Sequence, residues 1–144
     1  MTRLLLTRHC HVEGINPVRF RGRAELVLTP AGIAQAETLA QHVVRQRRPV
    51  AVYTRGLQRC VVTGAKIGLA CGASASMMDG MMDLDCGVWQ MRTHDEVKAE
   101  APDAFRLWHS APHLVRFPGG GSLQDLVART SGAWCWRGIR ARQS

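Results

Sequence analysis

Arg8 and His9 are the residues of this sequence whose types and spacing point most directly to chemistry, because together they end the short apolar run LLLT. The guanidinium of arginine is a planar fork that matches phosphoryl oxygens, and a neutral imidazole can attack phosphorus. Arg59 follows a second apolar run, residues 50–54. Ligands of open parallel sheets bind at the carboxyl ends of the strands. If both runs are strands, the three side chains meet at one crevice that suits a phosphoryl group.

The elements that would position these residues alternate along the first part of the chain. Residues 3–7 are predicted to form a short buried strand, and residues 50–54 a second one. Between them, residues 29–49 carry the apolar periodicity of an amphipathic helix, with Thr29 as N-cap and Pro30 at the first helical position. A strand, a helix and a strand in this order predict parallel strands joined by a right-handed crossover.

Further helices are predicted in the rest of the chain. An apolar face recurs through residues 57–69, whereas residues 72–82 have no clear pattern. Residues 93–96 are a candidate capping box that opens a short helix, and a second helix restarts at a proline over residues 102–108. Ser122 is placed to cap a final helix.

This set of elements has few strands for a covered parallel sheet. The last segment, SGAWCWRGIRARQS, lacks the apolar run of a buried strand. We therefore expect an α/β fold with a mostly parallel sheet that is incomplete at the C-terminus. The tail from about residue 131 is expected to be truncated or altered in its reading frame.

The composition is that of one globular domain. The 144 residues are 46% hydrophobic, and the longest apolar runs are too short for a membrane span or a secretory signal. The five cysteines include no C-x-x-C pair, so neither a disulfide framework nor a zinc site is indicated. We expect a cytoplasmic protein with a single domain, residues 1–144, that has free thiols, no metal and no membrane partner.

The net charge of +8 comes mainly from arginine, since Lys66 and Lys98 are the only lysines. Arginine suits either a phosphorylated substrate or nucleic acid. The arginine-rich stretches lie apart, at residues 19–23, 45–48 and 137–142, rather than in one stripe with interleaved aromatic residues. This distribution favours a small phosphorylated substrate as the partner over nucleic acid.

Four ordered blocks of the sequence resemble the histidine phosphatase superfamily, which is also called phosphoglycerate-mutase-like. The blocks are LLLTRHCHVEGINPVRFRGRAELVLTPAGIAQA, VYTRGLQRCVVTGAKI, LDCGVWQ and FPGGGSLQDLVAR, and they cover residues 3 to about 130. The resemblance implies a three-layer α/β sandwich and metal-independent hydrolysis of phosphomonoesters through a phosphohistidine, without a cofactor. The compact length and the Gly-Arg segment look most like the small bacterial phosphatases of this family.

The resemblance also implies roles for individual residues. His9 would be the nucleophile, while Arg8 and Arg59 would bind the phosphoryl oxygens. Asp83 matches the position of the acidic proton donor, and Asp85 is the alternative carboxylate. The residues implied to line the substrate side are Asn16, Arg21 and Gly22.

The sequence departs from the family pattern at several of these positions. Cys10 stands where the family has a glycine, Arg55 where it has serine, and Gly121 where it has glutamate. The family's second active-site histidine, which follows a late strand, has no counterpart, and His109 and His113 do not follow such a strand. The resemblance makes a phosphatase the preferred hypothesis, whereas these departures favour a catalytically inactive form. A phosphoglycerate-type mutase and a catalytically inactive phosphate-binding module are the alternatives, and a nucleic-acid binder ranks third.

Overall fold

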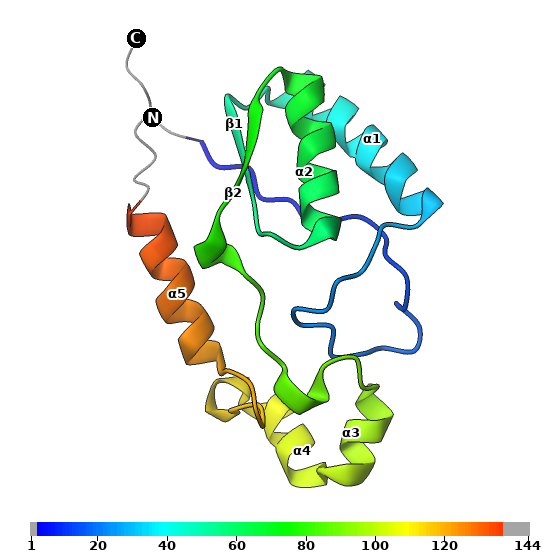
Figure 1. Cartoon of the computed structure of the whole chain (residues 1–144), viewed down its shortest axis with the longest axis vertical. Coiled ribbons are helices and arrows are strands. Elements are labelled where there is room, and N and C mark those ends of the chain that lie inside the picture. The colour runs from blue at the N-terminus through cyan, green and yellow to red at the C-terminus, as the bar shows by residue number, and fades with distance from the viewer. Residues whose placement is uncertain (1–2, 137–144) are drawn as a thin grey trace.

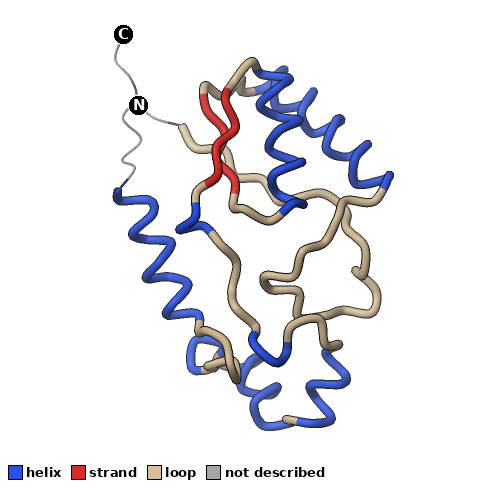
Figure 2. The backbone as a smooth tube through the Cα atoms, in the orientation of Figure 1, coloured by secondary structure: helices blue, strands red, loops and turns tan. Residues whose placement is uncertain are grey.

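The computed structural model describes residues 3–136, with side chains as far as residue 133. Helices and short strands follow one another along the chain (Figures 1 and 2). The elements in chain order are α1 (Pro30–Gln46), β1 (Ala51–Thr54), α2 (Gln58–Cys71), β2 (Ser74–Met77), the 3-10 helices η1 (Asp79–Met81) and η2 (Gly87–Trp89), α3 (His94–Glu100), α4 (Pro102–Ser110), the 3-10 helix η3 (Pro112–Leu114) and α5 (Leu123–Trp136).

A pair of parallel strands forms the sheet. β1 pairs with β2 from Ala51 opposite Ser74 to Thr54 opposite Met77, and α2 is the crossover between them. Figure 1 shows α1 and α2 together on one side of this sheet. The predicted α/β class with parallel strands is therefore confirmed. The buried residues of the core between these helices and the sheet are Ala40, Val43, Ile67 and Cys71.

Local signals in the sequence set the starts of the helices. α1 begins where predicted, because the Thr29 hydroxyl accepts the Gly32 N–H at 3.1 Å. Thr93 and Glu96 form the predicted capping box at α3, with each side chain bonded to the backbone of the other residue. α4 begins at the predicted Pro102. These three helix starts depend only on residues that are neighbours in the sequence.

A second core gathers aromatic side chains where α3 and α4 pack against the loop before α1. Phe20 is 5% exposed, and its ring centroid lies 5.1 Å from that of Trp89 and 6.1 Å from that of Phe117. Leu84 and Cys86 belong to the same core. The core therefore anchors the loop that carries the two candidate carboxylates.

The prediction of a strand at residues 3–7 is wrong. This segment pairs with no strand among the described residues, and Leu4, Leu5 and Leu6 are 56%, 49% and 74% exposed. A strand buried in a parallel sheet needs hydrogen-bonding neighbours and covering layers, whereas β1 pairs with β2 alone in the described part of the chain. The crossover unit is therefore β1–α2–β2, and β2 lies in residues 72–82, where no strand is predicted.

The last described helix, α5, has the predicted cap. The Ser122 hydroxyl accepts the Asp125 N–H at 3.2 Å, and the Ser122 N–H donates to Asp125 Oδ2 at 2.9 Å. The helix extends to Trp136, and the rest of the atypical tail lies outside the described residues. No helix within residues 3–136 is long and apolar enough to cross a membrane.

Candidate active site

The segment that carries His9 is held against the start of α1. The His11 carbonyl accepts the Thr29 N–H at 3.2 Å. Gly32 allows this approach, because a Cβ at this position would lie 2.0 Å from the His11 carbonyl oxygen. The Leu-Thr-x-x-Gly pattern in the sequence thus positions His9 by letting its segment pass close to the helix.

Thr63 joins the same segment to α2. Its hydroxyl donates to the Arg59 carbonyl one turn earlier at 2.8 Å and accepts the Cys10 N–H at 3.4 Å. Thr63 is 3% exposed, so this link lies inside the protein. The residue after His9 is therefore tied to the helix that carries the candidate phosphate-binding arginine.

His9 is half-buried, and its Nδ1 lies 2.8 Å from the Cys10 carbonyl oxygen. Because a carbonyl only accepts, Nδ1 carries the proton in this contact and Nε2 keeps a free lone pair. Burial lowers the pKa of His9, and the hydrogen bond to Cys10 opposes that shift. The charges of three arginines, Arg59, Arg55 and Arg8, lower the pKa further. The imidazole is thus favoured in the neutral form that a nucleophile requires.

Arg59 is the most deeply placed cation of the site, with 2% of its side chain exposed. Its Nη1 donates to the Ala24 carbonyl at 2.6 Å and its Nη2 to the Gly22 carbonyl at 2.9 Å. Its Nε is buried and has no partner among the described residues. Gly22 has a φ of 41°, and a Cβ there would lie 2.8 Å from the Leu84 carbonyl oxygen. The predicted Gly22 therefore helps to hold Arg59, and only glycine fits there.

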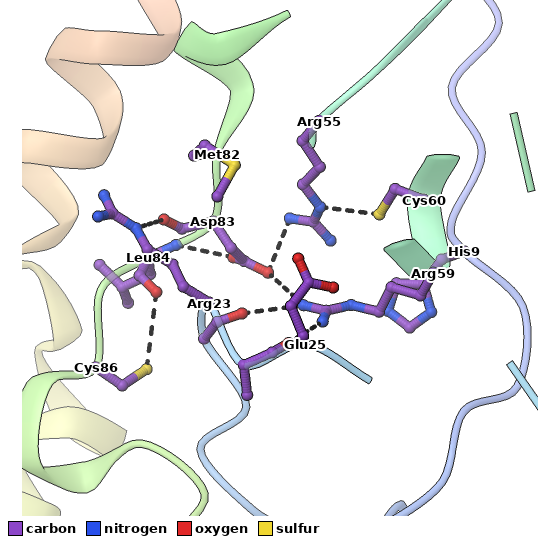
Figure 3. Close-up of polar contacts among 12 residues, drawn as sticks. His9, Arg23, Glu25, Arg55, Arg59, Cys60, Met82, Asp83, Leu84 and Cys86 are labelled. Atoms are coloured by element: carbon purple, nitrogen blue, oxygen red, sulfur yellow. Dashed lines mark hydrogen bonds and ion pairs between the residues drawn. The ribbon is translucent and has the colours of Figure 1, made fainter. Parts of the chain in front are cut away.

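Asp83 brings its carboxylate to two guanidinium groups (Figure 3). Its Oδ2 lies 2.8 Å from Arg55 Nη1 and 3.5 Å from Arg59 Nη2. Its Oδ1 accepts the Leu84 N–H at 2.9 Å. The sequence did not predict Arg55 in the site, although Arg55 follows β1 directly and so lies at the carboxyl end of a strand. Arg8 and His9, which were expected at such an end, follow a segment that forms no strand.

The backbone of this loop is held by two other arginines. The Asp83 carbonyl accepts from Arg23 Nε at 3.1 Å and from Arg129 Nη2 at 3.2 Å. Arg129, on α5, also donates from Nη1 to the Met82 and Gly80 carbonyls at 2.7 and 3.1 Å. The position of Asp83 therefore depends on a helix that lies far from it in the sequence.

Asp85, the alternative carboxylate, has different partners. Its Oδ2 forms an ion pair with Arg23 at 3.1 Å, and its Oδ1 accepts the Gly87 N–H at 3.0 Å. The described contacts join Asp83 to Arg59, and they join Asp85 to the turn that follows it. Asp83 is thus the carboxylate in contact with the candidate phosphate-binding cation.

The other predicted residues are less closely tied to this cluster. Arg8 is exposed and near enough for its charge to lower the pKa of His9. Asn16 is exposed and Arg21 is half-buried, and neither side chain has a hydrogen-bond or ion-pair partner in the described part of the protein. Within residues 3–136, no three His, Cys, Asp or Glu side chains are grouped so that they could hold a metal ion. His94 stacks on Phe20 in the aromatic core, with ring centroids 4.5 Å apart.

Two curated relatives cover most of this chain. Phosphoserine phosphatase 1 of Hydrogenobacter thermophilus is 35% identical over 133 residues, which are 92% of this chain and 62% of that protein. Glucosyl-3-phosphoglycerate phosphatase of Mycobacterium tuberculosis is 30% identical over 132 residues, which are 89% of this chain and 56% of that protein. The chain therefore spans about three fifths of the length of these relatives.

Solved structures resemble the fold over a similar extent. A mycobacterial glucosyl-3-phosphoglycerate phosphatase superposes with a TM-score of 0.80 at 26% identity, covering 89% of this chain and 59% of its own. YhfR of Bacillus stearothermophilus superposes with a TM-score of 0.84 at 24% identity, covering 95% of this chain and 67% of its own. These neighbours confirm the predicted phosphoglycerate-mutase-like fold. A model of the histidine phosphatase superfamily (branch 1) matches residues 4–143, and this chain belongs to that family.

Proposed function

We propose that this chain hydrolyses small phosphomonoesters through a phosphohistidine formed on His9. The observation that carries the proposal is one cluster of side chains: His9 lies within the electrostatic reach of the buried Arg59, and Arg59 contacts the Asp83 carboxylate. This cluster combines a nucleophile, a cation for phosphoryl oxygens and a group that can carry a proton. The relatives named as phosphatases support the same reaction class.

The reaction would take place in two steps. In the first, His9 Nε2 attacks phosphorus while the bond between phosphorus and the leaving oxygen breaks. Arg8 and Arg59 hold the phosphoryl oxygens, and a protonated Asp83 gives its proton to the leaving oxygen. In the second, water attacks phosphorus, the bond from phosphorus to Nε2 breaks, and Asp83 takes a proton from the water. The products are an alcohol and inorganic phosphate, and both side chains return to their starting forms.

The substrate side of the site is the part of the proposal that rests on the resemblance. Asn16 and Arg21 would contact the group that leaves, whereas Gly22 would act through the Arg59 guanidinium that its carbonyl binds. Phosphoserine and glucosyl-3-phosphoglycerate, for which relatives are named, are the first natural compounds to test. The free thiols among the described cysteines suit a reducing compartment, so we place the protein in the cytoplasm.

The test is hydrolysis of para-nitrophenyl phosphate by the purified chain in the presence of a metal chelator. We expect turnover that is lost in His9→Ala, together with an acid-labile phosphoryl group on the wild-type chain after rapid quenching. A folded His9→Ala variant that retained wild-type turnover would contradict the proposal. Transfer of phosphate between positions of phosphoglycerate without release of free phosphate would instead identify a mutase.

A phosphate-binding module without turnover is the second candidate. The observation that favours it is the pairing of Asp83 with two arginines, because these ion pairs occupy the carboxylate that would have to reach the leaving oxygen. Vanadate and inorganic phosphate are the probes, since structures of a mycobacterial relative contain each of them. Tight binding of both without turnover would establish this candidate, and measurable His9-dependent turnover would exclude it.

A further inference from the structure

We propose that Arg55 is a further phosphate-binding residue, and that its guanidinium moves from the Asp83 carboxylate to the phosphoryl oxygens when substrate binds. This inference rests on the proposed function. Arg55 follows β1 directly, so it leaves the sheet at the carboxyl end of a strand, where ligands of this class of fold bind. It shares the Oδ2 atom of Asp83 with Arg59, at 2.8 and 3.5 Å. Figure 3 shows the Asp83 carboxylate between the two guanidinium groups.

The N–H groups of Arg55 have few strong hydrogen-bond acceptors among the described residues. Nη1 pairs with Asp83, and Nε donates to Cys60 Sγ at 3.1 Å, which is a weak acceptor. Nη2 has no acceptor among the described residues. The side chain is 27% exposed, against 2% for Arg59. A ligand can therefore reach Arg55, and Arg55 can turn toward it, whereas Arg59 is fixed by two backbone carbonyls.

The balance of charge favours this exchange. A phosphoryl dianion offers three oxygens and two charges, and a guanidinium binds such a group through two parallel hydrogen bonds. The charge of Arg55 also lowers the pKa of His9, so the two side chains are within electrostatic reach of each other. Arg55 can therefore pass from the Asp83 carboxylate to the phosphoryl oxygens, while Arg59 stays on its two carbonyls.

The test compares the binding of inorganic phosphate and vanadate by calorimetry in the wild type, Arg55→Ser and Arg55→Lys. Arg116→Ser is the matched control, because Arg116 is another arginine paired with an aspartate, Asp125 at 3.0 Å, outside the site. We expect Arg55→Ser to weaken binding about 10- to 100-fold, as the loss of a charge-assisted contact predicts. Arg55→Lys should lose less, since it keeps the charge without the fork. Arg116→Ser should bind as the wild type does.

Unchanged phosphate affinity in a folded Arg55→Ser variant would overturn the inference, as would an equal loss in Arg116→Ser. If Arg55→Ser does not fold, wild-type affinity for phosphate and vanadate in Arg55→Lys overturns it. Failure of the proposed function has a different signature. Phosphate binding that depends on Arg55, in a chain without His9-dependent turnover, would refute hydrolysis and leave the Arg55 site standing.

Discussion

Replacing Asp83 by asparagine should change phosphate affinity and turnover in opposite directions. The carboxylate holds Arg55 at 2.8 Å and Arg59 at 3.5 Å, and the Asp83 and Arg55 side chains are 29% and 27% exposed. Ion pairs of partly exposed groups contribute about 0.2–1 kcal/mol each. Releasing the Arg55 pair should make inorganic phosphate bind about 1.4- to 5-fold more tightly. Turnover should fall about 10²- to 10⁴-fold, because the asparagine carboxamide is not an acid and cannot transfer a proton to the leaving oxygen.

The assay combines calorimetry with inorganic phosphate and steady-state kinetics on two aryl phosphates. The loss of kcat should be smaller with para-nitrophenyl phosphate than with phenyl phosphate, since a more acidic leaving oxygen needs less help from a proton donor. Asp85→Asn is the matched control, because Asp85 lies in the same loop and pairs with Arg23 at 3.1 Å. It should leave phosphate affinity close to that of the wild type. Weaker phosphate binding in Asp83→Asn, or equal losses with both substrates, would refute the reasoning.

Three further predictions concern pH, backbone strain and the Asp83 loop. Burial, reinforced by nearby arginine charges, lowers the pKa of His9, so the imidazole stays neutral below its ordinary pKa. The acid limb of kcat/KM should therefore lie below about pH 6.5, and a limb above that value would contradict the role of His9. Met91 has a φ of 65°, in the region that only glycine adopts freely. Urea denaturation should therefore find Met91→Gly more stable than Met91→Ala by about 1 kcal/mol, and equal stability would argue against strain. Arg129 donates three hydrogen bonds to carbonyls at and before Asp83, so Arg129→Ala should lower kcat about 10- to 100-fold by misplacing the carboxylate. Kinetics that match the wild type would show that the loop holds its position without this arginine.

The helices could be predicted because their signals are local. Thr29 caps α1, Thr93 and Glu96 close a capping box, and Ser122 caps α5, each through residues at most three positions away. Strands offered no such signal. The apolar run at residues 50–54 forms the predicted strand, β1, but the apolar run at residues 3–7 forms none. Pairing requires a neighbour from elsewhere in the chain, so an apolar run alone does not decide between the two.

Strand β2 is the opposite case: it forms a strand although its sequence predicts none. Its sequence, Ser-Ala-Ser-Met, contains no β-branched or aromatic residue, and all four residues are exposed. Its conformation is set by the ladder to β1 rather than by its own side chains. Small polar and apolar residues of this kind do not favour a strand by themselves, so local sequence patterns could not predict β2.

Only part of the candidate site could be predicted from the sequence. His9 and Arg59 were placed by the rule on strand ends together with the resemblance. In the structure Arg59 pairs with Asp83, and His9 is within the electrostatic reach of Arg59, although the segment before His9 forms no strand. Arg55 also ends a strand, but the resemblance has serine at its position, so it was counted as a departure. Asn16 rests on the resemblance alone, and no described contact joins its side chain to the cluster.

Asp83 shows why a motif alone cannot define this site. Four arginines surround it: Arg23 and Arg129 bind its carbonyl, and Arg55 and Arg59 bind its carboxylate. The first pair fixes the backbone. In the proposed exchange, Arg55 leaves the carboxylate for the phosphoryl group, while Arg59 stays on the Ala24 and Gly22 carbonyls. The proposed role of Asp83 as a proton carrier needs this division, because its main chain must stay in place while the charges around its side chain change. The spacing of residues in a sequence cannot reveal it, since the arginines meet only when α2, α5 and the loop before α1 pack around one residue.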